Sequence, residues 1–165
     1  MPWSARWRRR WRFSGSPMPD PADRALEDLF QELILDHYRR PRNKGALEPH
    51  THRIGLTNPS CGDELELDLV ISGDTIADVR FSGRGCSISQ ASASMMTQLI
   101  KGKSVHEARA LAARFNEMMH GSADAARDKA LGEARSLVGV AKFPVRVKCA
   151  LLGWNALEEG TKDNR

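Results

Sequence analysis

Residues 64–71 read Glu-Leu-Glu-Leu-Asp-Leu-Val-Ile, a stretch in which acidic and aliphatic side chains largely alternate. Successive side chains of a β-strand point to opposite faces, so a strand here would place its leucines on one face and its carboxylates on the other. Ser72-Gly73-Asp74 supplies a turn, after which apolar residues return with Ile76, Val79 and Phe81. The pattern predicts an antiparallel hairpin with one face in water.

Three strands are predicted, at residues 52–57, 64–72 and 75–82, and the aliphatic face of their antiparallel sheet needs a cover of helices. Apolar residues at helical spacing before the sheet predict an amphipathic helix of about 17 residues that ends at Pro41. They are Leu26, Leu29, Phe30, Leu33, Ile34 and Tyr38. Further helices are predicted at 87–102, from Ser104 with a capping box to Glu107, at about 123–135, and from Pro144 towards Glu159. The predicted fold class is therefore α+β, a small three-stranded antiparallel sheet packed against several helices.

The composition is that of an ordinary globular domain, with 165 residues, 41% hydrophobic and 28% charged. No apolar stretch approaches the roughly 20 residues of a membrane span, so we expect no passage through a bilayer. The formal net charge of +4 arises in residues 1–19, which contain five arginines and no acid. Because the remainder is close to neutral, the sequence does not favour nucleic-acid binding.

Residues 1–19 form a distinct segment in which Trp3, Trp7 and Trp11 are separated by arginines. We expect a disordered basic extension, with translation beginning at Met18 as one explanation. A helix on an anionic membrane surface and a targeting peptide are the alternatives. We expect a single folded domain over residues 20–160 and a frayed polar tail over 161–165.

The three cysteines form an odd set, which argues against a simple disulfide framework. Cys61 lies in a predicted turn, and Asp63 follows two residues later, so both side chains can face one ion. Cys86 follows a pair of glycines at the start of a predicted helix, where the helix dipole favours the thiolate.

The third cysteine, Cys149, lies early in the last predicted helix, beside Lys148 and near Arg146. We expect these cations to lower its pKa. Three thiols and a carboxylate are a plausible ligand set for a soft metal, and three independent structural cysteines are the alternative. A few unpaired cysteines suit the reducing cytoplasm.

Each cysteine lies in an extended motif. The motifs are Asn58-Pro59-Ser60-Cys61-Gly62-Asp63, the stretch from Phe81 to Met95 with Gly83, Gly85 and Cys86, and Arg146-Val147-Lys148-Cys149-Ala150-Leu151-Leu152 followed by Trp154. These motifs closely resemble those of the iron–sulfur assembly proteins of the IscU/NifU N-terminal superfamily. The resemblance covers about residues 24–160, including the basic loop at 39–45, and implies the fold of that superfamily.

In two details the sequence is similar to the SufU branch of this superfamily. Lys148 stands where IscU-type scaffolds carry a histidine, and an additional helical stretch around residues 120–138 separates the second and third cysteines. The chaperone-docking motif of IscU is replaced here by residues 143–148. Recognition by a dedicated chaperone is therefore not expected from the sequence.

The resemblance to SufU-like proteins implies that Zn²⁺ is held by Cys61, Asp63, Cys86 and Cys149. It further implies that Cys61 accepts sulfane sulfur, as a persulfide, from a PLP-dependent cysteine desulfurase of the SufS type. The sulfur would then pass to SUF-type assembly machinery. The expected activity is that of a sulfurtransferase-like sulfur carrier rather than a stand-alone enzyme.

Four basic residues are weaker candidates for partner binding, namely Arg146, Lys148, Arg39 and Arg40. For the loop at 39–45, a solvated helix end that complements the helix dipole is the alternative. Two other functions remain open for the whole chain. One is a scaffold that assembles and transfers a transient [2Fe–2S] cluster on the same residues, and the other is a structural zinc domain that mediates interactions.

Overall fold

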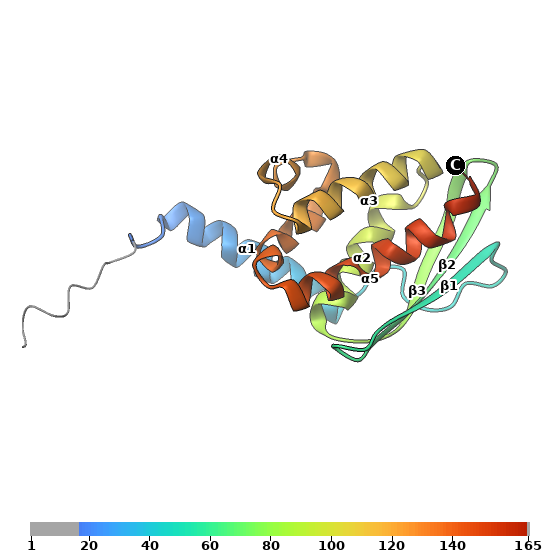
Figure 1. Cartoon of the computed structure of the whole chain (residues 1–165), viewed down its shortest axis with the longest axis horizontal. Helices are drawn as coiled ribbons and strands as arrows, with labels where there is room; N and C mark the ends of the chain where they lie inside the picture. Colours follow the sequence, from blue (N-terminus) through green and yellow to red (C-terminus); the bar gives the residue numbers. More distant parts are fainter. Residues whose placement is uncertain (1–16, 165) are drawn as a thin grey trace, which may run out of the picture.

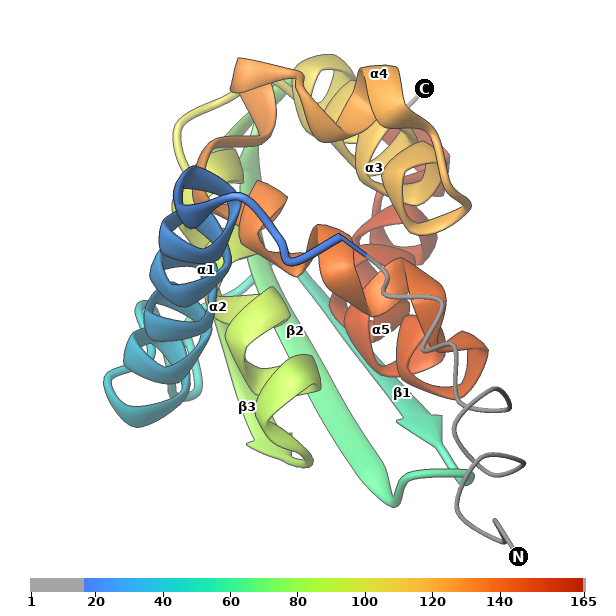
Figure 2. The ribbon, with the colours of Figure 1, turned by 90° about the vertical axis from the view of Figure 1, so that its left-hand side faces the viewer.

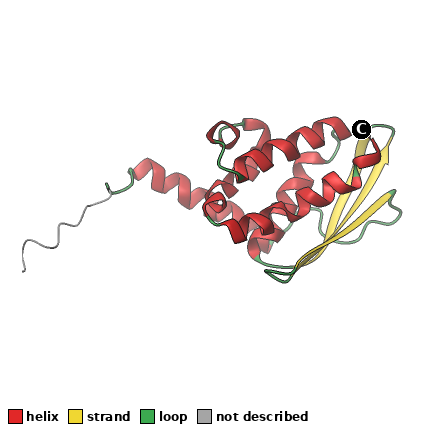
Figure 3. Ribbon diagram, viewed as in Figure 1, coloured by secondary structure: helices red, strands yellow, loops and turns green. Residues whose placement is uncertain are grey.

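A computed structural model describes residues 17–164, in which three strands lie along one side of a group of helices (Figure 1). The elements follow in the order α1 (Pro21–Arg39), β1 (His52–Asn58), β2 (Asp63–Ser72), β3 (Thr75–Arg84), α2 (Ser87–Ile100), α3 (Val105–Met119), α4 (Ala123–Ala126), the 3-10 helix η1 (Lys129–Lys142), α5 (Pro144–Gly160) and the 3-10 turn η2 (Lys162–Asn164). The antiparallel sheet with its cover of helices confirms the predicted α+β class (Figure 3).

β2 is the central strand of the sheet, and β1 and β3 pair with it on either side. Leu67 of β2 stands opposite both Ile54 of β1 and Phe81 of β3, so apolar side chains meet across all three strands. Leu65 and Leu69 are buried on the same face, as the alternating sequence predicts. In this register Asn58 stands opposite Asp63, so the turn between β1 and β2, which carries Cys61, lies at one end of the sheet.

α2 is the centre of the helical layer, with α1 and α5 packed beside it (Figure 2). All side chains from Ser89 to Thr97 are buried, and most of them are small, which allows two helices to approach α2 closely. The stacked rings of Phe115 and Trp154, with centroids 4.5 Å apart, join α3 to α5. The helices that carry the second and third cysteines are therefore held together by the core.

α1 forms where the apolar spacing predicts it, but the first half of the helix does not pack as expected. Leu26 and Leu29 are half exposed, and Tyr38 near the end of the helix is exposed as well. α1 is longer than α2 and projects beyond the body of the molecule (Figure 1). Leu33 and Ile34, further along the helix, are apolar residues of α1 that pack against the core, and His37 is buried.

The prediction of a single helix at about residues 123–135 is wrong in the type of helix and in its length. The structure has the short helix α4, which ends at Ala126, and then the 3-10 helix η1. Asp128 separates the two, because its side chain accepts a hydrogen bond from the N–H of Ala130 and begins a new helix. Gly132 has φ of +51°, which interrupts the helical geometry inside η1.

The structure describes the two ends of the chain to different extents. Of the expected extension at 1–19, residues 1–16 lie outside the described part. In the expected tail at 161–165, Thr161 is buried and accepts a hydrogen bond from Arg109, with 2.8 Å between Nη1 and Oγ1. The domain boundaries at residues 20 and 160 stay predictions. None of the helices in residues 17–164 is long and apolar enough to span a membrane.

Candidate metal centre

Cys61 and Asp63 lie on the turn between β1 and β2. The turn closes where the backbone N–H of Cys61 donates to the carbonyl oxygen of Asn58, 3.2 Å away. Gly62 has φ of +67°, a left-handed conformation that favours glycine. Asp63 begins β2, stands opposite Asn58 and is buried, whereas Cys61 is only half-buried. The turn therefore exposes the thiol to solvent and withdraws the carboxylate.

Cys86 is the N-cap residue of α2, in agreement with its predicted place at a helix start. Its Sγ accepts a hydrogen bond of 3.5 Å from the N–H of Ser89, the role that an oxygen side chain usually has at this position. The N–H of Cys86 itself donates to Oδ1 of Asp63 over 2.8 Å. Gly85 makes this approach possible, because a Cβ at that position would collide with the same carboxylate oxygen.

Cys149 is buried in α5, and its Sγ lies 2.9 Å from Sγ of Cys61. The ligand atoms of Cys61, Asp63 and Cys149 all lie within 4.8 Å of one another. Cys86 does not belong to this close group, although its backbone is bound to Asp63. The structure thus brings three of the four predicted ligands together and places the fourth beside them.

The three close residues have a donor set and a spacing that fit a zinc ion. Tetrahedral zinc–thiolate sites have Zn–S distances near 2.3 Å, which separates two sulfur ligands by about 3.8 Å. A group whose ligand atoms lie within 4.8 Å of one another can satisfy such a geometry with small side-chain adjustments. Thiolate sulfur with one carboxylate oxygen also suits iron, so the donor set alone does not select one of the two metals.

The expected lowering of the pKa of Cys149 by neighbouring cations is wrong. Burial raises the pKa of this thiol, and its hydrogen bonds with Cys61 and Asp63 raise it further. Arg146 and Lys148 are exposed on α5, so water screens their charges from the buried thiol. The interior position of Cys149 outweighs the basic residues next to it in the sequence.

The four candidate docking residues lie in two exposed places. Arg146 and Lys148 are exposed on the first part of α5, and Arg39 and Arg40 are exposed at the end of α1. Arg40 pairs with Asp36 one turn earlier, with 2.9 Å between Nη2 and Oδ1. Their exposure is compatible with partner contact, and their role stays a prediction.

The basic loop after α1 has a defined position along α2. The backbone N–H of Arg42 donates to Oγ of Ser94 over 2.8 Å, and Nζ of Lys44 donates to Oε1 of Gln90 over 2.6 Å. Gln90 and Ser94 are one and two turns beyond Cys86 on the same helix. The loop is therefore fixed near the helix that carries the second cysteine.

Two polar residues that contact the ligand candidates received no role from the sequence. Nδ2 of Asn58 lies 3.4 Å from Oδ2 of Asp63 and 3.5 Å from Sγ of Cys149. Oγ of Ser89 lies 3.2 Å from Oδ1 of Asp63. Asn58 begins the first cysteine motif and Ser89 stands three residues after the second cysteine, so their places in the motifs were the available signal.

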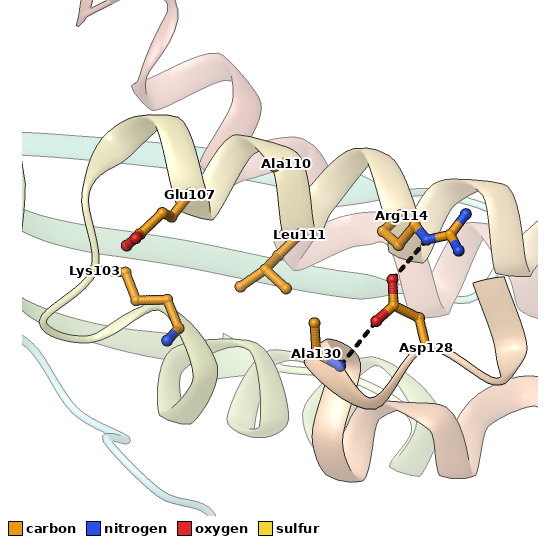
Figure 4. A pocket seen from close by; sticks show the side chains of 7 residues that line it. All are labelled: Lys103, Glu107, Ala110, Leu111, Arg114, Asp128 and Ala130. Carbon is orange, nitrogen blue, oxygen red and sulfur yellow. Dashed lines mark hydrogen bonds and ion pairs between the residues drawn. The ribbon is translucent and has the colours of Figure 1, made fainter.

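A cleft between α3 and η1 offers a second place for a ligand, and none of its lining residues is a metal-ligand candidate (Figure 4). Arg114 is its most basic lining group, with Nε 2.7 Å from Oδ2 of Asp128. The same guanidinium also pairs with Glu117 and Asp124. Its charge is already matched by three carboxylates, so the cleft has no free guanidinium to attract an anion.

Comparison with known proteins gives a consistent family. Residues 29–163 match the family model described as NifU-like N terminal domain. The zinc-dependent sulfurtransferase SufU of Bacillus subtilis is 48% identical over 136 residues, which cover 82% of this chain and 90% of that protein. The iron–sulfur cluster assembly scaffold protein IscU of Streptococcus pyogenes is 47% identical over 137 residues, which cover 83% of this chain and 85% of that protein.

A solved structure adds the same result for the fold. The crystal structure of a candidate iron–sulfur cluster assembly scaffold protein for the SUF system, from Fervidobacterium islandicum, has a TM-score of 0.70 and 37% sequence identity. The match covers 78% of this chain and 93% of that chain. With the family model spanning most of its length, the chain belongs to the family of NifU-like N-terminal domains.

Proposed function

We propose that this protein acts in iron–sulfur cluster assembly as a zinc-bound sulfur acceptor. In this role Cys61 receives sulfane sulfur from a PLP-dependent cysteine desulfurase and relays it to SUF-type assembly machinery. The observation that carries the proposal is the difference between the two thiols in contact: Cys61 is half-buried on a turn, whereas Cys149 is fully buried in α5. The similarity to a zinc-dependent sulfurtransferase supports it.

The chemical step is an exchange between sulfur atoms with no net oxidation. The thiolate of Cys61 attacks the outer sulfur of a cysteine persulfide on the donor, and a new S–S bond forms at Cys61. The S–S bond of the donor breaks at the same time, and the donor cysteine leaves as a thiolate. An accessible attacking thiol is essential, and Cys61 meets this requirement better than Cys149.

Cys61, Asp63 and Cys149 would hold a zinc ion, and Cys86 would complete the shell from the start of α2. A bound zinc ion would keep the thiols deprotonated at neutral pH and protect them from oxidation. The hydrogen bonds of Asp63 orient its carboxylate towards the thiols. The three cysteines are unpaired, and we place the protein in the reducing cytoplasm on this ground.

Transfer of ³⁵S from labelled cysteine through a cysteine desulfurase tests the proposal. Label should accumulate on Cys61 as a persulfide, detected after alkylation by peptide mass spectrometry. A Cys61→Ser variant should accept no label, while a Glu159→Ala variant, changed at an exposed ion pair near the end of α5, should accept it normally. A Cys61→Ser variant that stimulated the desulfurase as strongly as the unaltered protein would contradict the proposal.

A second candidate function is a scaffold for a transient [2Fe–2S] cluster on the same residues. The similarity to a scaffold protein named IscU favours it, and Lys148 counts against it because a histidine there would supply a further ligand. Anaerobic reconstitution with iron and sulfide separates the two functions. A stable cluster that passes intact to an apo-ferredoxin would favour the scaffold. Unfolding on zinc removal, with no persulfide on any thiol, would indicate a structural zinc domain.

A further inference from the structure

Two buried polar residues each connect a pair of the metal-ligand candidates. Ser89 connects Cys86 with Asp63: its N–H donates to Sγ of Cys86 over 3.5 Å, and its Oγ lies 3.2 Å from Oδ1 of Asp63. The single hydroxyl proton is shared between this carboxylate and the carbonyl oxygen of Cys86, 3.1 Å away. Ser89 is 1% exposed, so water does not replace these bonds.

Asn58 makes the corresponding connection between Asp63 and Cys149. Its side-chain amide donates to Oδ2 of Asp63 and to Sγ of Cys149, and the residue is 6% exposed. The two protons of the amide nitrogen allow one bond to each acceptor. Together with Ser89, it forms a continuous path of hydrogen bonds in the order Cys86, Ser89, Asp63, Asn58, Cys149.

Cys61 is outside this path. Among the described residues, its thiol makes its side-chain contact with the thiol of Cys149. A metal bound by both sulfur atoms would replace this contact, and the Cys61 side chain, half-buried on its turn, would then be held by the metal alone. The site therefore has three ligand candidates fixed by protein hydrogen bonds and one that is free to leave.

We propose that Asn58 and Ser89 are positioning residues that retain the metal while Cys61 is away from it. They hold Asp63 and Cys149 within the close ligand group and Cys86 beside it, so that these three ligands keep the ion when Cys61 leaves it. The need for such release rests on the proposed sulfur transfer at Cys61. The retention itself is a property of the metal site and is measured with zinc alone.

The experiment measures the rate of Zn²⁺ loss to an excess of a chromophoric chelator in two backgrounds. The first background is the unaltered protein, and the second is Cys61→Ser, which imitates the state with Cys61 removed from the ion. Ser89→Ala and Asn58→Ala are introduced into each. In the unaltered background we expect the rate of release to rise less than about threefold. In the Cys61→Ser background we expect a rise of about tenfold or more, in line with the loss of metal affinity that follows removal of a group that orients a metal ligand.

Two further variants separate positioning from general stability. Ser94→Ala removes another buried hydroxyl from α2, one that bonds to α1 and the basic loop, and should leave zinc release unchanged in both backgrounds. Ser89→Thr keeps the hydroxyl and should restore slow release. Ser89→Ala removes one oxygen atom only, so it remains informative if Asn58→Ala fails to fold. The absorption spectrum of the Co²⁺ form reports the ligand geometry independently.

Three results would overturn the proposal. They are a Cys61→Ser protein that binds no zinc, equal effects of Ser89→Ala in both backgrounds, and an equally large effect of Ser94→Ala. The persulfide assay is independent of all three, because no desulfurase is present in the release experiment. A different result, in which Cys61 accepts no sulfur while Ser89→Ala still speeds zinc release mainly in the Cys61→Ser background, would refute the proposed function and leave the positioning role intact.

Discussion

The carboxylate of Asp63 accepts a 2.8 Å hydrogen bond from the backbone N–H of Cys86, which joins the first residue of β2 to the N-cap of α2. This bond brings together two motifs that are separated by the whole β2–β3 hairpin. It depends on the close approach of the backbone at Gly85. The acid that follows the first cysteine is therefore held by the segment that carries the second.

A methyl group at Gly85 should disturb this contact and weaken metal binding. In Gly85→Ala the added Cβ would meet both Oδ1 of Asp63 and Oγ of Ser89, so the carboxylate must move. We expect zinc affinity to fall by about tenfold or more, measured by competition with a chelator. Gly55→Ala, where nothing lies within 4 Å of the added Cβ, is the matched control. Equal affinities in the two variants would show that the contact does not position Asp63.

Two thiols of the zinc-free protein, those of Cys61 and Cys149, should react with iodoacetamide in a defined order. Cys61 is half-buried and should be alkylated before Cys149, because Cys149 is fully buried and burial raises the pKa of its thiol. A raised pKa means that less thiolate is present at pH 8, and the thiolate is the reactive form.

Peptide mass spectrometry at successive times measures this order. In guanidinium chloride the difference between Cys61 and Cys149 should disappear, which controls for effects of the local sequence. Alkylation of Cys149 as fast as Cys61 in the folded protein would contradict the burial argument.

The parts of the fold and site that follow from short-range sequence patterns could be predicted. The alternation around Leu67 sets the strand and its buried face, and a two-residue separation is enough to bring Cys61 and Asp63 onto one turn. The helix predicted from residue 87 begins there, so the predicted place of Cys86 at a helix start is confirmed. The cysteine motifs then identified the family, because they are specific over several residues each.

The parts that depend on how elements pack could not be predicted in the same way. Leu26 has the helical spacing of a core residue, yet α1 extends beyond its neighbour and leaves that side chain half exposed. The basic neighbours of Cys149 in sequence suggested a lowered pKa, whereas its depth in the fold raises it. The contacts of Asn58 with Cys149 and of Ser89 with Asp63 join segments far apart in the chain, so the sequence marks these residues only by their places in the cysteine motifs and does not show what they contact.

Loss of the contact between Glu133 and His37 should destabilise the fold more than loss of a surface ion pair. His37 is completely buried, with Nδ1 2.7 Å from Oγ of Ser94 and Nε2 bound to the Glu133 carboxylate. In Glu133→Ala a buried ring nitrogen loses its partner, which we expect to lower the free energy of unfolding by about 1–2 kcal/mol.

Urea unfolding followed by circular dichroism measures this difference. Glu159→Ala, which removes an exposed ion pair with Lys162, is the control and should cost less than about 0.5 kcal/mol. Equal losses of unfolding free energy in the two variants would mean that the contact between Glu133 and His37 does not stabilise the packing of η1 against α1.

The ion pair of Arg53 and Asp68 should make stability depend on pH in the acid range. Nε of Arg53 lies 2.7 Å from Oδ1 of Asp68, and this hydrogen bond is the largest cause that holds the pKa of the buried carboxyl below its usual range, despite the opposing effect of burial. A carboxyl with a depressed folded-state pKa adds stability above its unfolded pKa of about 3.9, and that stability disappears as the pH falls through the folded value.

Replacement of Arg53 by methionine leaves Asp68 buried without its cation, so Arg53→Met should be clearly less stable at pH 7. As the pH falls below about 4, Asp68 becomes protonated and the difference from the unaltered protein should shrink. Urea unfolding at pH 7, 5 and 3.5 measures this change. Arg84→Met removes a neighbouring exposed pair with Glu64 and should lose little at any pH. A loss in Arg53→Met that stayed constant from pH 7 to 3.5 would mean that the aliphatic part of Arg53, rather than its charge, stabilises the sheet.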